Sequence, residues 1–92
     1  MAADVRLIQI ARILGLPLRG LDHTRAREAI SLRAPEVALA FFLEAVDSDD
    51  VTSVESALDY LDGRMAFFQG LVTPSGAATI EAAFREKLRS WA

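Results

Sequence analysis

Apolar residues recur at helical spacing in several segments of the chain, and glycine, proline or capping residues separate these segments. The first segment runs from about Ala3 to Leu14 and ends before Gly15, a residue type common at helix C-termini. The second begins near Asp22 or Thr24, both favourable N-cap residues, and continues to about residue 32. The pattern therefore predicts two helices in the first third of the chain.

The third segment is the most apolar part of the chain. Pro35 followed by Glu36 is typical of the first turn of a helix, and nine of the ten residues in VALAFFLEAV (37–46) are apolar. A buried β-strand is the alternative, but the alanines and the proline–glutamate start favour a helix. A helix that is apolar on nearly all sides is predicted to lie in the middle of a bundle, with Glu44 marking the strip that reaches solvent.

Two further helices are predicted in the second half. Thr52-Ser53-Val54-Glu55 has the pattern of a capping box, in which Thr52 and Glu55 satisfy free backbone N–H groups. The helix that follows runs to about Gln69, and its apolar residues alternate four and three apart, as in a heptad seam (positions 54, 58, 61, 65, 68 and 72). Thr73-Pro74 starts a last helix that ends near Trp91. The sequence thus predicts an all-α, compact bundle of about five short helices, forming one domain over residues 1–92.

Charge is unevenly distributed along the chain. Residues 1–33 hold six basic and three acidic residues, residues 34–62 hold eight acidic and no basic residues, and residues 63–92 hold four basic and two acidic residues. The net charge is −3. This polarity restricts which partners can approach the protein and in which orientation.

The side chains give little support for catalysis. The chain has no cysteine and one histidine, His23, which we expect to be a surface or capping residue. The acidic run DSDDVTSVE (47–55) has Val51, Thr52 and Leu58 where an EF-hand needs an oxygen ligand, a glycine and a glutamate. We therefore expect no enzyme activity, no metal site and no cofactor.

Membrane insertion and secretion are not predicted either. The longest apolar run, at 37–43, has seven residues, whereas a spanning helix needs ~20. Asp4, Arg6 and Arg12 interrupt the apolar residues of the first helix, unlike the core of a secretion signal. We expect a cytoplasmic protein with no membrane partner.

The stretch QIARILGLPLRGLDHTRARE (9–28) has the alanine, glycine and leucine spacing of a helix-turn-helix. Over about a dozen residues it resembles the C-terminal DNA-binding region of alternative sigma factors, in which a segment of the form IA–LG–PL leads into a basic recognition helix. The resemblance implies DNA binding, with Arg19, Arg25 and Arg27 on phosphates. The chain departs from it at Gly20 and Asp22, which fall within the expected recognition helix. The alternative is two packed helices joined by a tight turn, without DNA.

An acidic stripe is predicted on the fourth helix, because Glu55, Asp59 and Asp62 follow one another at helical spacing. The stripe is suited to a protein partner with a basic surface. The alternative is a solvated face that the arginines of the first two helices neutralise.

Aromatic residues suggest a second contact surface. Tyr60, Phe67 and Leu71 lie beside the heptad seam, and Trp91 stands at the end of the chain. Tyrosine and tryptophan are favoured interface anchors, so this strip is expected to pack either inside the bundle or against a partner or a second copy.

These observations favour a small non-enzymatic protein-interaction or regulatory module, of the adaptor or inhibitor type. Its predicted contact residues are those of the acidic stripe and the aromatics Tyr60, Phe67 and Trp91. The alternative is a DNA-binding regulator that uses residues 9–28 and dimerises through the fourth helix. A structural subunit with an oligomer seam is the third possibility.

Overall fold

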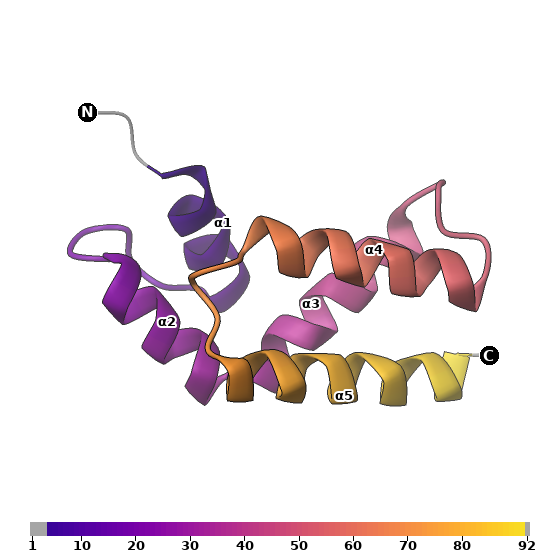
Figure 1. Ribbon diagram of the computed structural model, residues 1–92. Helices are drawn as coiled ribbons and strands as arrows, with labels where there is room; N and C mark the ends of the chain where they lie inside the picture. The colour runs from indigo at the N-terminus through magenta and orange to yellow at the C-terminus, as the bar shows by residue number, and fades with distance from the viewer. Residues whose placement is uncertain (1–3, 92) are drawn as a thin grey trace.

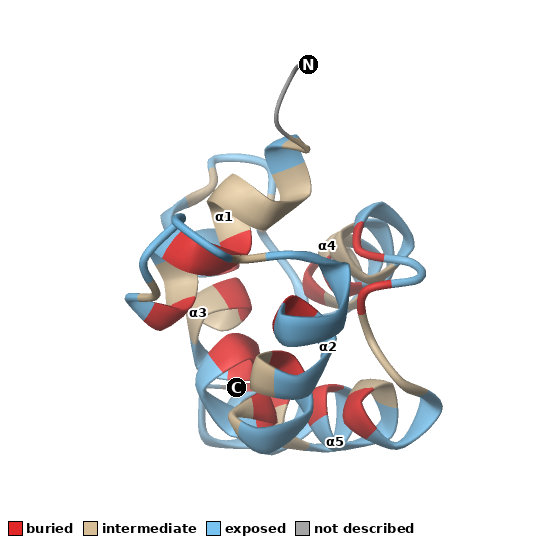
Figure 2. Ribbon diagram, turned by 90° about the vertical axis from the view of Figure 1, so that its left-hand side faces the viewer, coloured by how far each residue is buried: buried red, intermediate tan, exposed pale blue. Residues whose placement is uncertain are grey.

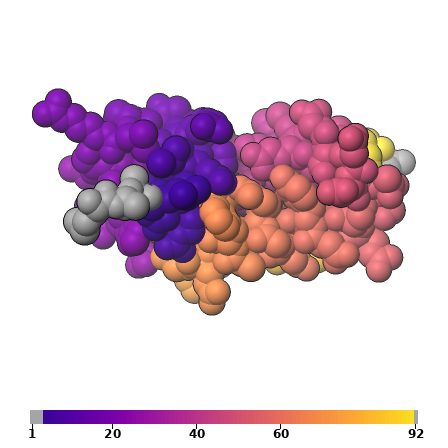
Figure 3. Space-filling view, turned by 90° about the horizontal axis from the view of Figure 1, so that it is seen from above, coloured from indigo at the N-terminus to yellow at the C-terminus, as the bar shows by residue number. Residues whose placement is uncertain are grey.

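The computed structural model describes residues 4–91, which form five α-helices and no β-strand (Figure 1). The helices are α1 (Val5–Leu14), α2 (His23–Leu32), α3 (Ala34–Asp47), α4 (Val54–Phe67) and α5 (Pro74–Trp91). The predicted all-α bundle is therefore confirmed. The molecule measures 41 × 26 × 20 Å, with α1 and α2 at one end and the α3–α4 connection at the other (Figures 1 and 3).

The first two helices begin and end where their local sequence requires. The Asp4 carboxylate caps α1 by accepting a hydrogen bond from the backbone N–H of Arg6 at 2.9 Å, and Asp22 caps α2 through Arg25 at 2.8 Å. Gly15 ends α1 in the left-handed conformation with φ of 66°, which a side chain would disfavour.

Arg33 is the single residue between α2 and α3, and its side chain ties three helix ends together. It donates to the carbonyl of Leu14 at the end of α1 (2.7 Å) and to the Glu36 carboxylate in the first turn of α3 (3.0 Å). The guanidinium lowers the pKa of Glu36 through this hydrogen bond. Because Arg33 holds the end of α1 at the start of α3, both lie at the same end of the molecule.

Helix α3 is the centre of the bundle and contacts each of the other four helices, most extensively α5. One side of it is fully buried (Ala34, Val37, Ala38, Phe41 and Ala45), and the three alanines on that side let neighbouring helices approach closely. Its phenylalanines are fixed by aromatic contacts, with Phe41 stacked on Phe68 and Phe42 edge-on to Phe84, both at 5.7 Å between ring centroids.

The opposite side of α3 is open to solvent, contrary to the expectation of a helix covered all round. Leu39, Leu43 and Val46 are 40%, 53% and 41% exposed. In Figure 2, α3 lies on the left with α4 and α5 on the right, so the neighbouring helices cover only one flank of α3. The other four helices are distributed too unevenly around α3 to bury both of its apolar sides.

The start of α4 differs by one residue from the prediction. Ser53, not Thr52, is the N-cap, and the hydroxyl of Ser56, not the carboxylate of Glu55, completes the capping box. Ser53 Oγ accepts from Ser56 N at 3.1 Å, and Ser56 Oγ accepts from Ser53 N at 3.0 Å. The Ser53 hydroxyl takes over the role because the helix begins at Val54, one residue later than the Thr52 cap would require.

The heptad seam of α4 is buried at its middle and open at its start. Leu61 and Phe68 are buried, whereas Val54 is 43% exposed. Leu71, expected on an outer strip, is also buried because it follows the turn that ends α4 and points back into the core.

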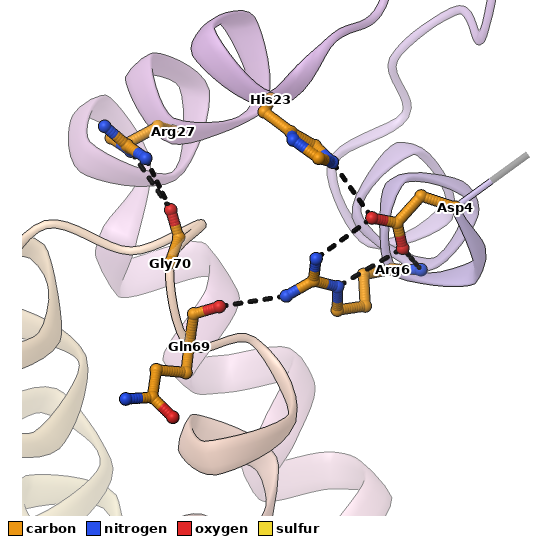
Figure 4. A network of polar contacts seen from close by, with 6 residues as sticks. All are labelled: Asp4, Arg6, His23, Arg27, Gln69 and Gly70. Atoms are coloured by element: carbon orange, nitrogen blue, oxygen red, sulfur yellow. Dashed lines mark hydrogen bonds and ion pairs between the residues drawn. The ribbon is translucent and has the colours of Figure 1, made fainter.

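A polar network fastens the α4–α5 turn to the first two helices (Figure 4). Arg6 bridges the Asp4 carboxylate and the carbonyl of Gln69, at 3.0 and 2.9 Å. His23 Nε2 lies 2.9 Å from Asp4 Oδ2, the same carboxylate oxygen that Arg6 Nη2 contacts. The hydrogen bonds from Arg6 and His23 hold the pKa of Asp4 far below its usual range.

The capping difference predicts a specific pair of stability changes. Ser53→Ala should lower the free energy of unfolding by about 1 kcal/mol, because the N–H of Ser56 loses its acceptor. Thr52→Ala should change it by less than about 0.5 kcal/mol, since that side chain caps nothing. Urea unfolding followed by circular dichroism measures both, and a larger loss for Thr52→Ala would contradict this cap.

The Asp4 network predicts a pH-dependent contribution to stability. Because folding lowers the pKa of Asp4, its charge stabilises the native state above the unfolded pKa of about 3.9. This contribution is lost as the pH falls from there toward the folded pKa. Asp4→Asn keeps an N-cap but removes the charge, so its melting temperature should fall below wild type at pH 7 and converge with it in acid. A difference that does not change with pH would contradict the charged network.

Candidate interaction surfaces

The acidic stripe of α4 is present as predicted from its spacing. Glu55, Asp59 and Asp62 are all exposed on this helix. Within residues 4–91 none of the three forms an ion pair. The same holds for Asp47, Asp49 and Asp50 in and after the last turn of α3.

The arginines of the first two helices do not neutralise these carboxylates. Among the described residues, the only ion pair that joins residues 1–33 to the acidic segment 34–62 is the local one between Arg33 and Glu36. The end of α3 and the connection that follows it, with Asp47, Asp49 and Asp50, lie at the opposite end of the molecule from α1 and α2 (Figure 1). Direct ion pairs from the first two helices therefore do not neutralise these carboxylates within the described residues.

An apolar groove of about 270 Å³ lies between α4 and α5. Its apolar lining consists of Val54, Leu58 and Leu88, and Arg85 and Arg89 stand on the α5 side. On the surface of α4, Leu58 has Glu55 three residues before it and Asp62 four residues after it, so these two carboxylates are among its neighbours on the helix. Two of the three residues of the acidic stripe therefore lie one helical turn from the groove wall.

The Tyr60 side chain contacts another helix of the same chain. It is half-buried, and its hydroxyl donates to Glu44 Oε2 on α3 at 3.1 Å. Burial and this hydrogen bond raise the pKa of Tyr60. Glu44 is exposed, as expected, but it also faces Arg64 of α4 at 3.8 Å, so it joins α3 to α4.

Arg64 is a structural centre that the sequence analysis did not single out. Its guanidinium lies over the rings of Phe41, Phe67 and Phe68, at 5.2–5.6 Å from their centroids, and donates to Gln9 Oε1 of α1. The exposed Phe67 ring thus packs on one side of the Arg64 guanidinium. In the sequence, the only sign of a structural role for Arg64 was its position on the fourth helix four residues after Tyr60.

Tyr60, Phe67 and Trp91 do not share one surface. Phe67 ends α4 beside α1, whereas Trp91 ends α5 at the other end of the molecule (Figure 1). Trp91 packs edge-on against Phe42 of α3 at 6.2 Å and remains substantially exposed. It therefore adjoins the open side of α3 instead of the α4 aromatics.

The open side of α3 is the second surface, and sequence reasoning missed it. Leu39, Leu43 and Val46 follow at i, i+4 and i+7, so they form one apolar stripe along the helix. The spacing was visible in VALAFFLEAV, but the wholly apolar segment was interpreted as buried.

The predicted helix-turn-helix does not form. Residues 15–22, which belong to no helix, separate α1 from α2, whereas that motif has a turn of about 3–4 residues. Gly20 and Asp22 lie in this connection, so no recognition helix occupies it. Arg27 donates to the carbonyl of Gly70 at 2.7 Å, and Arg19 and Arg25 flank a small pocket around Leu21.

This arrangement predicts that the protein does not bind duplex DNA. At about 50 mM salt, where phosphate contacts are strongest, an electrophoretic mobility assay should show no retardation of random duplex. Retardation that disappears in Arg19→Ala/Arg25→Ala/Arg27→Ala would contradict it and restore the DNA-binding alternative.

Two further features concern metals and membranes. Among residues 4–91, no group of three or more histidine or acidic side chains is placed to hold a metal ion. No helix in the described part of the chain is both long and apolar enough to cross a membrane.

Comparison with protein-family models, with curated proteins and with solved structures finds no match to this chain. No relative therefore assigns a role to any of these residues.

Proposed function

We propose that the chain is a non-enzymatic protein-interaction module, of the adaptor or inhibitor type, that binds a partner with a basic surface on the outer side of α4 and α5. One observation carries this proposal. Glu55, Asp59 and Asp62 are exposed on α4 without an ion pair among residues 4–91, and α4 also supplies one wall of an apolar groove.

The groove supplies the apolar part of such an interface. Val54 is exposed at its rim, Leu58 is half-buried in its wall and Leu88 is buried at its floor. A volume of about 270 Å³ accommodates one large apolar side chain from a partner. Burial of one leucine or phenylalanine there contributes roughly 1.5–3 kcal/mol of transfer free energy.

The charges on the two sides of the groove are unequal. On the α5 side, Arg85 is paired with Glu81 at 3.1 Å and Arg89 with Glu86 at 3.2 Å, so that side is neutral by itself. On the α4 side the three carboxylates keep their charge. The groove therefore attracts cations, and it fits an amphipathic helix whose apolar ridge is flanked by lysine or arginine.

The free protein is slightly destabilised by this arrangement. Glu55, Asp59 and Asp62 repel one another along α4, at a few tenths of a kcal/mol for each neighbouring pair. Cations of a bound partner relieve this repulsion, so it strengthens the preference for a basic partner.

The lack of cysteine fits a reducing compartment, and we place the interaction in the cytoplasm.

Neutralising the stripe tests the proposal. Asp59→Asn/Asp62→Asn should abolish capture of the partner by the purified protein from lysate, measured by quantitative mass spectrometry. With the recovered partner in pure form, the same variant should raise Kd by about 10-fold or more at low salt, since two charge contacts are lost. Its stability should equal or slightly exceed that of wild type.

The control Glu28→Gln/Asp50→Asn changes the net charge equally at exposed positions outside α4. It should raise Kd by less than about 2-fold, because only long-range attraction is reduced. Equal losses for the two variants, or a partner that binds wild type and the stripe variant alike, would contradict the proposed surface.

A further inference from the structure

The open side of α3 is unlike the outer face of an ordinary bundle helix. A helix that faces solvent on one side carries polar residues there, whereas α3 presents Leu39, Leu43 and Val46 at 40–53% exposure. Phe42 and Trp91 extend the apolar surface along one flank, since their rings meet at 6.2 Å. Tyr60 and Arg64 of α4 contact Glu44, which lies on another side of α3 from Leu39, Leu43 and Val46, so this surface faces away from α4.

The stripe is complementary to itself when it is turned end for end. Leu43 lies near the midpoint between Leu39 and Val46. If two copies of α3 pack antiparallel about a two-fold axis at Leu43, this residue meets its own counterpart, and Leu39 of each copy meets Val46 of the other. Such isologous pairing closes after two copies.

The charges at the two ends of α3 favour the same orientation. Asp47, Asp49 and Asp50 lie where α3 ends, and within residues 4–91 they have no ion pair. Residues 1–33 hold six basic and three acidic residues, and their helices α1 and α2 lie at the opposite end of the molecule (Figure 1). Antiparallel packing brings the acidic end of one copy beside the basic end of the other, whereas parallel packing would bring like charges together.

We propose that the Leu39–Leu43–Val46 face of α3 binds the same face of a second copy of this chain, antiparallel about a two-fold axis at Leu43. The association is weak, because the stripe has three aliphatic side chains, whereas a standard interface has roughly 20–30 residues and ~800 Å² per partner. It also weakens with salt, since the acidic and basic ends contribute through exposed charges.

Sedimentation velocity from about 1 µM to about 1 mM, where small interfaces associate, should show a monomer–dimer equilibrium. Leu43→Glu should raise the dimer Kd by at least about 30-fold, because it places two like charges at the axis. Unchanged circular dichroism would establish that this variant is folded. A monomer at every concentration in wild type, or a Leu43→Glu variant that still dimerises, overturns the proposal.

Val46→Lys and Val54→Lys are a matched pair, because the two valines are 41% and 43% exposed on opposite surfaces. Val46→Lys should weaken the dimer and leave capture of the basic partner intact, whereas Val54→Lys should do the reverse. Each variant therefore tests one interaction without disturbing the other, so failure of the proposed dimer can be told apart from failure of the proposed partner binding. Loss of the dimer with Val54→Lys alone would move the interface to α4 and α5 and contradict the α3 face.

Single cysteines test the orientation, since the natural chain has none. Leu43→Cys should form an intermolecular disulfide under mild oxidation. Leu39→Cys should cross-link to Val46→Cys in a mixture but not to itself, because antiparallel packing separates the two copies of residue 39 by roughly 10 Å along the helix. Self-linkage of Leu39→Cys and of Val46→Cys, without the mixed product, would indicate parallel packing and overturn the proposed symmetry.

Discussion

The fold depends on the burial of one side of α3. Its alanines permit close approach, Phe41 stacks on Phe68 from the α4–α5 turn, and Phe42 packs edge-on against Phe84 of α5. Every other helix contacts α3. The most extensive contacts of α4 and α5 are with α3, whereas α1 and α2 contact each other most. Polar contacts then fix the ends: Arg33 joins α1 to α3, and Arg6 and Arg27 hold the α4–α5 turn against the first two helices. Arg64 joins α4 to α1 and, across a longer gap, to Glu44 of α3.

Much of this fold could be predicted from local sequence signals. Gly15, the Asp22 cap and Thr73-Pro74 placed helix boundaries correctly, because each acts through bonds to its own neighbours in the chain. Signals that depend on tertiary packing were less reliable. Thr52 and Ser53 are both good caps, and only the final start of α4 selects Ser53. Leu71 looks like a surface residue on a continued helix, yet the chain turns before it and buries it.

The surfaces were harder to predict than the core. Periodicity placed Glu55, Asp59 and Asp62 on one side of α4, but the groove beside them needs Leu88 from a distant helix. The spacing of Leu39, Leu43 and Val46 was equally visible, but exposure is decided by which sides the other helices cover. Neutralisation of the acidic segment by the arginines near the N-terminus was the alternative to a free acidic stripe. The fold places α1 and α2 at the opposite end of the molecule from Asp47, Asp49 and Asp50, which leaves these carboxylates open to other molecules.

We infer that α3 organises the bundle with one apolar side and that its other apolar side associates with a second copy. Methyl NMR spectra of leucine and valine, recorded between about 50 µM and about 1 mM protein, test it directly because weak association shifts only the methyl groups at the contact. We expect the methyl chemical shifts of Leu39, Leu43 and Val46 to change with protein concentration. Those of the exposed Val54 and the half-buried Leu58 should stay constant. Constant spectra throughout, or shifts confined to Val54 and Leu58, would contradict it.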